Sequence, residues 1–311
     1  MLEKRVAERV RKIRDELATK GDVHSAAQLA RYCDTFRSRF GPEVLGSLDG
    51  EKLLDTMHDN LDHDSLVYWL EFKNDDEFPA LFGSIAGGSA LKFEIYRRKE
   101  TGAWMTGHPL KQLELPVTEA IEIARRHRDE FLRGVECLET LPPQGSDEDY
   151  RKVQEQMNRI APSVSDSVWG HKYFSVLFAA KLEDLHASNL QRFHLIKLLQ
   201  VPPVGDGRYL TGGRYVALAN ELDLSLNGLT NVLNRLNVGV NRYWRVGTSD
   251  GTNARNRWAL MQEHSAAAIG WEALGDLSWV KPDEASRGRI RELLERHYPN
   301  SPNVLTRWVK E

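Results

Sequence analysis

The spacing of apolar positions predicts helices at the start of the chain. Over residues 4–20 the apolar side chains recur at intervals of three and four, as they do on one face of an amphipathic helix. These side chains are Val6, Val10, Ile13 and Leu17. A second helix is expected over about residues 25–40, because Gly41 and Pro42 form a strong stop signal.

Residues 65–107 have a different pattern, rich in β-branched and aromatic side chains. SLVYWLEFK (65–73), LKFEIYRR (91–98) and GAWMTG (102–107) are expected to be strands. GSIAGGSA (83–90) is a small-residue turn region between the first two. Residues 1–115 are therefore predicted to form an α+β module.

The next part of the chain returns to helical spacing. A helix is predicted over 117–141, several helices over 150–200, and two helices over 216–236 with a tight turn around Asp223. From Asn241 the pattern becomes strand-like again. The predicted class is α+β, with an N-terminal α+β module (1–115), a helical middle region (116–238) and a C-terminal β-rich domain (239–311).

Composition and charge narrow the function classes. Hydrophobic residues make up 41% and charged residues 28%, as in an ordinary globular protein. The net charge of −3 gives no overall basic signature, so a nucleic-acid surface would have to be local. Cys33 and Cys137 lack the spacing of a zinc site or a disulfide framework. The absence of a signal-like or 18-residue apolar stretch predicts a cytoplasmic protein without membrane association.

No catalytic motif is evident. The dipeptide Gly-Lys does not occur, so the phosphate-binding P-loop is missing, and we expect no nucleotide cofactor. The histidines lack the helical spacing of a metal pair, so no metal site is expected either. One alternative is a PD-(D/E)XK-like nuclease module, because Glu71 and Lys73 form a Glu-x-Lys triplet with Asp62 and Asp64 upstream.

The region 188–260 is locally basic. It has nine lysines and arginines and four acidic residues. The basic residues are Arg192, Lys197, Arg208, Arg214, Arg235, Arg242, Arg245, Arg255 and Arg257. Interleaved aromatic residues include Phe193, Tyr209, Tyr215 and Tyr243. Basic groups neutralise phosphates and flat rings stack on bases, whereas the alternative is that the rings form core and the arginines are solvated. The last five arginines are the candidates for contacts with a DNA backbone.

Four of the eight tryptophans lie in one stretch: Trp244, Trp258, Trp271 and Trp279. A base flipped out of a duplex is held between aromatic faces while polar groups read its edge. A methyl group on that base gains further from an apolar cage. At least one of the four, with Trp279 as the candidate, is expected to be core instead.

The succession YWRVGTSDG (243–251), RWALM (257–261) and AIGWEALGDLS (268–278) resembles the opening half of an EVE-like domain, which has the PUA/YTH fold. Such domains occur in the N-terminal regions of McrB-type AAA+ restriction proteins. Residues 169–203 resemble the helical region that precedes this domain in those proteins, and residues 65–107 resemble a segment found in a subset of them.

The resemblance implies recognition of DNA, with a modified, methylated base flipped into an aromatic pocket. It places Trp244, Trp258 and Trp271 as candidate pocket walls and Asp276 as an acceptor for the edge of the base. The implied partners are DNA and a McrC-type nuclease, within a homo-oligomeric restriction ATPase. In the family this domain has further strands and is followed by a motor, so the resemblance implies an incomplete, partial PUA/EVE-like β-barrel here.

Two other classes remain open. Residues 216–245 can be interpreted as a helix-turn-helix with a wing, in which the second helix enters a major groove of unmodified DNA. Its exposed face would carry Asn227, Asn231, Asn234 and Arg235. A structural adaptor that docks partner subunits is a third class for residues 1–140.

Overall fold

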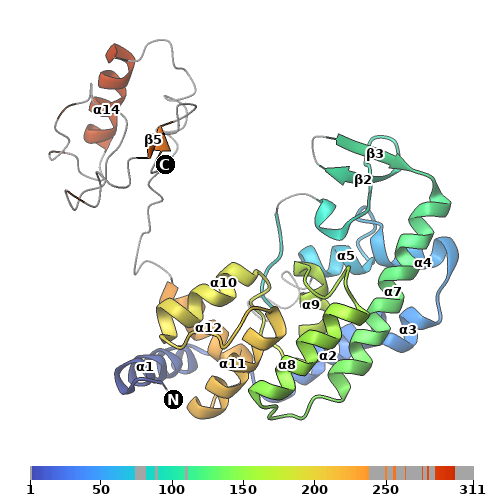
Figure 1. Ribbon diagram of the computed structural model, residues 1–311, viewed down its shortest axis with the longest axis horizontal. Helices are drawn as coiled ribbons and strands as arrows, with labels where there is room; N and C mark the ends of the chain where they lie inside the picture. Colours follow the sequence, from blue (N-terminus) through green and yellow to red (C-terminus); the bar gives the residue numbers. More distant parts are fainter. Residues whose placement is uncertain are drawn as a thin grey trace. The chain divides into compact units, whose positions relative to one another are not determined.

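The computed structural model describes residues 2–73, 82–87, 90–108 and 111–237, together with residues 249–250, 255–256, 263, 275, 279 and 284–297. The chain divides into two compact units, Met1–Val240 and Asn241–Glu311, and each is described by itself. The first unit is mostly helical with a small antiparallel sheet (Figure 1), which is consistent with the predicted α+β class.

Helices α1 (Lys4–Lys20) and α2 (Ala26–Phe40) confirm the two predicted at the N-terminus. The apolar face of α1 packs on α12, with Val10 fully buried. Helix α1 ends at Gly21, whose φ of 75° favours glycine. Ser25 caps the N-terminus of helix α2: its hydroxyl accepts from the amide of Gln28, and the Gln28 side chain accepts from the amide of Ser25.

The strand predicted at residues 65–73 is wrong. After α3 (Pro42–Gly46) and α4 (Gly50–His58), this segment forms a short helix α5 (Leu66–Tyr68) and a π-helical turn η1 (Trp69–Lys73). Leu66, Val67, Trp69 and Leu70 are all buried. Burial at positions i, i+1, i+3 and i+4 fits a helix, whereas a strand would alternate. Tertiary packing therefore overrides the β propensity of these residues.

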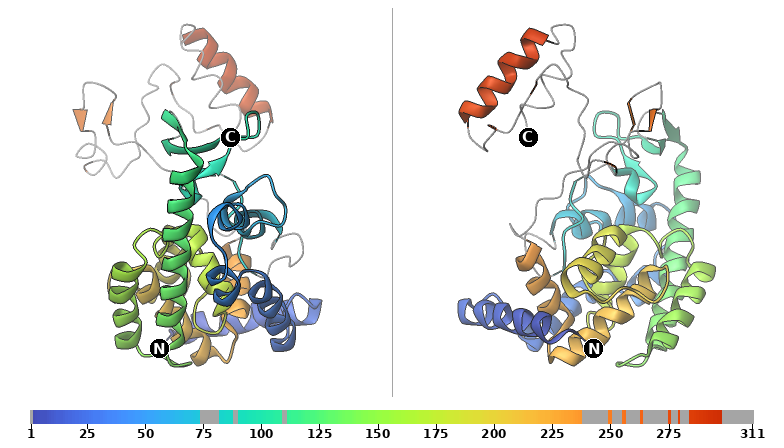
Figure 2. Two further views of the ribbon diagram at one scale, coloured as in Figure 1. Left: turned by 90° about the vertical axis from the view of Figure 1, so that its right-hand side faces the viewer. Right: turned by 60° about the vertical axis from the view of Figure 1, so that its left-hand side comes forward.

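The sheet has the strand order β1 (Tyr96–Arg97), β2 (Trp104–His108) and β3 (Lys111–Leu115). Strand β2 confirms the strand predicted at 102–107, whereas the strand predicted at 91–98 is reduced to β1. A 3-10 turn, η2 (Ala90–Phe93), precedes β1, and Glu94 between them has a φ of 69°. Strand β3 was not predicted. Figure 2 shows the β2–β3 hairpin beside the first turns of α7.

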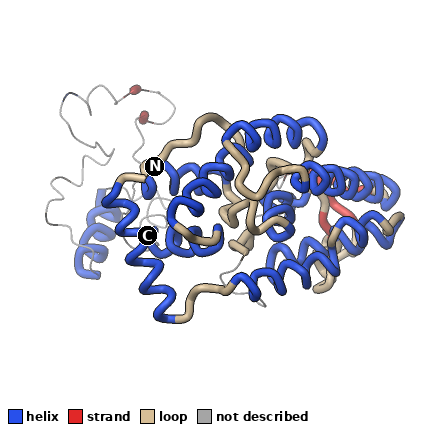
Figure 3. The backbone as a smooth tube through the Cα atoms, turned by 90° about the horizontal axis from the view of Figure 1, so that it is seen from below, coloured by secondary structure: helices blue, strands red, loops and turns tan. Residues whose placement is uncertain are grey.

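The predicted helical region is confirmed, and Figure 3 shows that helices dominate this unit. Its elements are α7 (Val117–Glu139), α8 (Asp147–Ile160), α9 (Val168–Leu177), α10 (Ser188–Phe193), the π-helical η3 (His194–Leu199), α11 (Arg208–Leu222) and α12 (Leu226–Asn237). Asp223, at the predicted turn, has a φ of 56°.

An aromatic core joins the N-terminal helices to the middle region. The rings of Phe131 on α7 and Tyr173 on α9 lie 4.1 Å apart, and Tyr173 also contacts Phe36 on α2. The Tyr173 hydroxyl donates to the carbonyl of Phe40 at 2.9 Å. Helix α7 packs on both α3 and α4. The segments 1–115 and 116–237 therefore share one hydrophobic core.

In the second unit the described elements are β4 (Ser249–Asp250), β5 (Arg255–Asn256) and α14 (Glu284–His297). Strands β4 and β5 pair antiparallel, with Ser249 opposite Asn256. The guanidinium of Arg289 lies 4.4 Å from the centre of the Trp279 ring, which is half-buried. A β-barrel is not among these described elements, so the predicted partial PUA/EVE-like barrel stays a prediction.

Candidate nucleic-acid interface

A polar groove lies between helix α1 and the segment formed by η3 and α12. Its cavity volume is about 650 Å³. We call it the α1 groove and define it by its charged lining residues, Arg5, Arg9, Lys12, Lys197, Glu3 and Glu8. Figure 1 shows α1 alongside α12 at the end of the unit that carries the N-terminus.

Three of the four cations come from one stripe of α1. Arg5, Arg9 and Lys12 are spaced by four and then three residues, which places them on one face of a helix. All three are exposed. The apolar face of the same helix is fixed by Ala7 and Val10, which are buried in the core. The stripe is therefore held in place by packing of the neighbouring apolar side of α1, whose Val10 also borders the groove.

The fourth cation, Lys197, comes from η3. This π-helical turn is anchored by His194, Leu195 and Leu199, which are buried, whereas Lys197 is exposed. The turn ends at Gln200, whose φ is 59°. The π turn thus buries Leu195 and Leu199 and leaves Lys197 on the wall of the groove opposite α1.

The charge balance of the α1 groove is positive. Two carboxylates, Glu3 and Glu8, lie among the four cations. Within the part of the chain that the structure describes, no ion pair involves Arg5, Arg9 or Lys12. Cations that are exposed, clustered and without a carboxylate partner are suited to neutralise the phosphates of a nucleic acid.

Sequence reasoning missed the α1 stripe. The helix was correctly predicted, and its Arg-x-x-x-Arg-x-x-Lys spacing is visible in the sequence. The groove, however, depends on Lys197 lying opposite the stripe, and nearly two hundred residues separate the two. No local sequence pattern predicts that these two segments face each other.

Among the predicted DNA-backbone residues, Arg235 is exposed on α12, and its neighbour Leu236 lines the α1 groove. Arg242, Arg245 and Arg257 lie outside the described residues, and only the backbone of Arg255 is described, in β5. The predicted pocket residues also lie outside the described residues: Trp244, Trp258, Trp271 and Asp276.

Other basic residues of the predicted surface are used inside the fold. Arg208 is buried and donates to the carbonyls of His186 and Asp166. Arg214 forms an ion pair with Asp147 at 3.2 Å. The predicted stacking role is wrong for Tyr209 and Tyr215, since both rings are fully buried. For these residues the alternative interpretation, that they form core, is correct.

The exposed face predicted for a recognition helix is also wrong. Asn227 is buried and donates to Asp184 at 2.9 Å, and Asn231 donates to Asn227 at 3.2 Å. Only Asn234 and Arg235 of the four predicted residues are exposed. Helix α12 is committed to packing on α1, α11 and η3, so it does not present a reading face to a major groove.

The described residues around the Glu-x-Lys triplet do not have the arrangement predicted for a nuclease site. Glu71 lies on η1 instead of a strand, and its carboxylate is paired with Lys92. Lys92 also donates to the carbonyls of Ile85 and Gly87, so it fixes the glycine-rich loop as well. Lys73 pairs with Asp64 at 3.3 Å. No group of three metal-ligating side chains is found among the described residues.

A carboxylate and two histidines form a chain near α7. His127 Nε2 donates to Glu94 at 2.9 Å, and the other ring nitrogen of His127 lies 3.1 Å from His58 Nε2. The hydrogen bond from His127 lowers the pKa of Glu94 to about 2. Because His127 lies between its two partners, the three side chains do not converge on one point, as metal ligands would.

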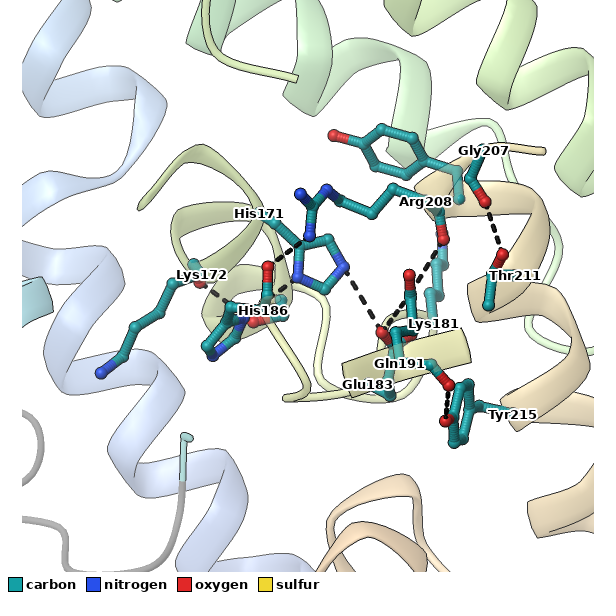
Figure 4. A network of polar contacts seen from close by, with 12 residues as sticks. His171, Lys172, Lys181, Glu183, His186, Gln191, Gly207, Arg208, Thr211 and Tyr215 are labelled. Carbon is teal, nitrogen blue, oxygen red and sulfur yellow. Dashed lines mark hydrogen bonds and ion pairs between the residues drawn. The ribbon is translucent and has the colours of Figure 1, made fainter. Parts of the chain in front are cut away.

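A buried polar network links helices α9, α10 and α11 (Figure 4). His186 Nε2 donates to the carbonyl of Phe82 at 2.5 Å, so its Nδ1 is free to accept from His171 Nδ1 at 3.0 Å. The remaining nitrogen of His171 lies 3.7 Å from Glu183. Gln191 donates to Glu183 and to the carbonyl of Arg208.

Burial sets the protonation states in this network. It raises the pKa of Glu183 to about 8 and lowers the pKa of His186 to about 3. Both groups are therefore largely neutral at pH 7. Because the network is buried, its role is to hold α9, α10 and α11 together.

No protein-family model, no curated protein and no solved structure matches this chain. None of the described helices is both long enough and apolar enough to span a membrane.

Proposed function

We propose that this chain is the DNA-recognising region of a McrB-type, modification-dependent restriction protein. In this proposal the α1 groove holds DNA phosphates, and the C-terminal unit reads a modified base. The single observation that carries the proposal is the α1 groove, with its stripe of exposed cations facing Lys197. The resemblance of residues 169–203 and 241–280 to the McrB-type family gives the class of protein.

The groove would supply affinity for DNA of any sequence and would not distinguish modified from unmodified bases. Phosphate contacts release counterions and favour binding to any duplex, but they carry no base information. Base recognition is assigned to the C-terminal unit, proposed to be a partial PUA/EVE-like barrel. Trp244, Trp258 and Trp271 are its proposed pocket walls and Asp276 its proposed edge acceptor.

The two proposed contact sites are close along the chain. Leu236 lines the α1 groove, and the second unit begins at Asn241. A short tether raises the effective concentration of the second site once the first is bound. Weak phosphate binding by the groove would therefore increase the residence of the base-reading unit on the same duplex.

The proposed partners are those that the resemblance to the McrB-type family implies. DNA is the ligand, and a McrC-type nuclease, with the nucleotide-driven motor of a homo-oligomeric assembly, would act on the DNA once it is recognised. The buried face of α12 argues against the alternative of a sequence-specific regulator.

The test uses fluorescence anisotropy with duplexes of one sequence that contain cytosine, 5-methylcytosine or N6-methyladenine. Replacing Trp244 or Trp271 with alanine should weaken binding to the preferred methylated duplex by roughly ten- to a hundredfold, the value of one stacking partner. Binding to the plain duplex should persist, because the α1 groove is unchanged.

The matched variants separate the two sites. Arg5→Gln, Arg9→Gln and Lys12→Gln together should weaken binding to all three duplexes by a similar factor. If wild-type protein binds no duplex, the proposal fails. Equal loss on all duplexes in the tryptophan variants, with a lowered melting temperature, would assign the tryptophans to the core and contradict the proposed pocket.

A further inference from the structure

The outer edge of strand β3 has no partner strand among the residues that the structure describes. The strand order is β1-β2-β3, and among the strands that the structure describes none pairs with the far side of β3. Lys111, Gln112, Leu113 and Glu114 are all exposed. An open edge presents unpaired amides and carbonyls, which form a ready template for another strand.

Leu113 makes this edge unusual. Its side chain is 62% exposed, more than that of any other large hydrophobic residue described as exposed. It lies opposite Thr106 in the hairpin, whereas its neighbour on the same face, Leu115, lies opposite the buried Trp104. The hairpin thus carries an apolar side chain, Leu113, outside the core of the unit.

The register of the hairpin determines which backbone groups are free. Two residues separate His108 from Lys111, and the five pairs run from His108–Lys111 to Trp104–Leu115. In an antiparallel ladder closed by a two-residue loop, Lys111, Leu113 and Leu115 direct their amides and carbonyls toward β2. Gln112 and Glu114 therefore direct theirs outward, to the open edge.

The strand is complementary to a second copy of itself. A two-fold axis perpendicular to the sheet pairs residues of the same face, and centring it on Leu113 places each Gln112 opposite Glu114 of the second copy. The outward backbone groups of these two residues then form hydrogen bonds with each other. The two Leu113 side chains meet as a close, non-hydrogen-bonded pair.

Charge supports the same register. Arg98 donates to the Gln112 side chain at 2.7 Å, on the face that also carries Glu114. Pairing with a second copy would bring its Glu114 to Gln112 and Arg98. Neither Arg98 nor Glu114 has an ion pair among the described residues. The contact is made twice because of the two-fold axis.

We propose that this protein associates with a second copy of itself through antiparallel pairing of the two β3 strands, centred on Leu113. The two sheets would join into one six-stranded sheet. A single pair of short strands buries little surface, so the dimer is expected to be weak and concentration-dependent. The inference is independent of DNA binding.

The experiment is sedimentation equilibrium of the full chain over a range of concentrations. Wild-type protein should shift from monomer to dimer as its concentration rises. Leu113→Lys should weaken dimerisation by about tenfold or more, because it replaces an apolar pair with two like charges. Leu61→Lys is the matched control, since Leu61 is 41% exposed after α4, and it should leave the dimer unchanged.

A charge exchange tests the register. Glu114→Arg and Arg98→Glu should each weaken the dimer, and the double variant should restore it. A monomer at every concentration, or a dimer insensitive to Leu113→Lys, would overturn the proposal. Association of the monomeric protein only with a different strand-donating protein would also overturn it. Circular dichroism melting checks that every variant is folded.

Discussion

Glu183 is a carboxyl group that the fold keeps protonated. It lies between α9 and α10 and is fully buried. One of its oxygens accepts from Gln191, whereas the other has no hydrogen-bond partner. An ionised carboxylate there would be a desolvated charge, and this cost outweighs the favourable effect of the Arg208 charge. Burial accordingly raises the pKa of Glu183 to about 8 from 4.5.

This shift makes the stability of the protein depend on pH. Because the pKa in the folded state lies above that in the unfolded chain, the stabilising contribution is complete below pH 4.5 and is lost as the pH rises through 8. His186 acts in the opposite direction. Its folded pKa of about 3 lies below the unfolded value of 6.5, so its contribution is lost as the pH falls from 6.5 to 3.

Glu183→Gln should therefore be more stable than wild type at alkaline pH. The amide keeps the oxygen that Gln191 contacts and cannot ionise. We expect the free energy of unfolding of the two proteins to be similar near pH 4.5 and to diverge by a few kcal/mol toward pH 8. Urea denaturation at a series of pH values measures it. A constant difference across this range would contradict the protonated state of Glu183.

At the scale of elements, the loop 82–87 is pinned to two distant segments. Lys92 binds the carbonyls of Ile85 and Gly87, and the Phe82 carbonyl accepts from His186. Gly83 has a φ of 63°, and a Cβ atom built on it would lie 2.0 Å from the carbonyl oxygen of Asp184. The loop therefore approaches the 184–186 segment at a distance that only glycine permits.

Gly83→Ala and Gly87→Ala form a matched pair that separates the two causes of strain. Gly87 also has a positive φ, of 89°, but a Cβ built there would have no neighbour within 4 Å. Gly87→Ala should lower the free energy of unfolding by roughly 1–2 kcal/mol through backbone strain alone. Gly83→Ala should cost this amount plus about 1–3 kcal/mol for the clash. Thermal or urea denaturation compares them, and equal losses would show that the loop does not pack as described.

The helices were predictable because their signals are local. The Ser25 cap, the stop at Gly41 and the spacing on α7 can be identified within one stretch of sequence. The helical form of residues 65–73 was not predictable, because burial of Leu66 and Val67 together with Trp69 and Leu70 depends on packing against distant residues.

The candidate site also combines features that are visible in local sequence with features that depend on distant residues. Counting charges over 188–260 could not distinguish Arg208, which binds carbonyls inside the core, from Lys197, which is exposed. A composition count treats both as surface. The stripe on α1 was visible as spacing, but its partner across the groove comes from a remote π-helical turn. Local patterns therefore predicted the helix, whereas the groove that it lines can be identified only from the tertiary structure.

In the whole molecule, we propose that the two units have different tasks. The first unit supplies a rigid helical body with a basic groove, and the second is proposed to read the base. The division at Val240 falls just after α12, whose penultimate residue Leu236 lines the groove. Affinity and specificity would thus come from separate parts of the chain, joined by a short connection.

The salt dependence of DNA binding distinguishes phosphate contacts in the α1 groove from contacts elsewhere on the protein. The dissociation constant for an unmodified duplex is measured against sodium chloride concentration for wild type and two triple variants. The groove variant is Arg5→Gln, Arg9→Gln and Lys12→Gln. The control is Lys4→Gln, Arg11→Gln and Lys20→Gln, which removes the same charge from exposed positions of the same helix outside the groove.

Each phosphate contact contributes roughly one unit to the slope of the logarithm of affinity against the logarithm of salt concentration. We expect the slope of the groove variant to fall by about two to three units while the control keeps the wild-type slope. Equal slopes for wild type and the groove variant, or the same reduction in both triple variants, would contradict the assignment of the α1 groove as the phosphate-binding site.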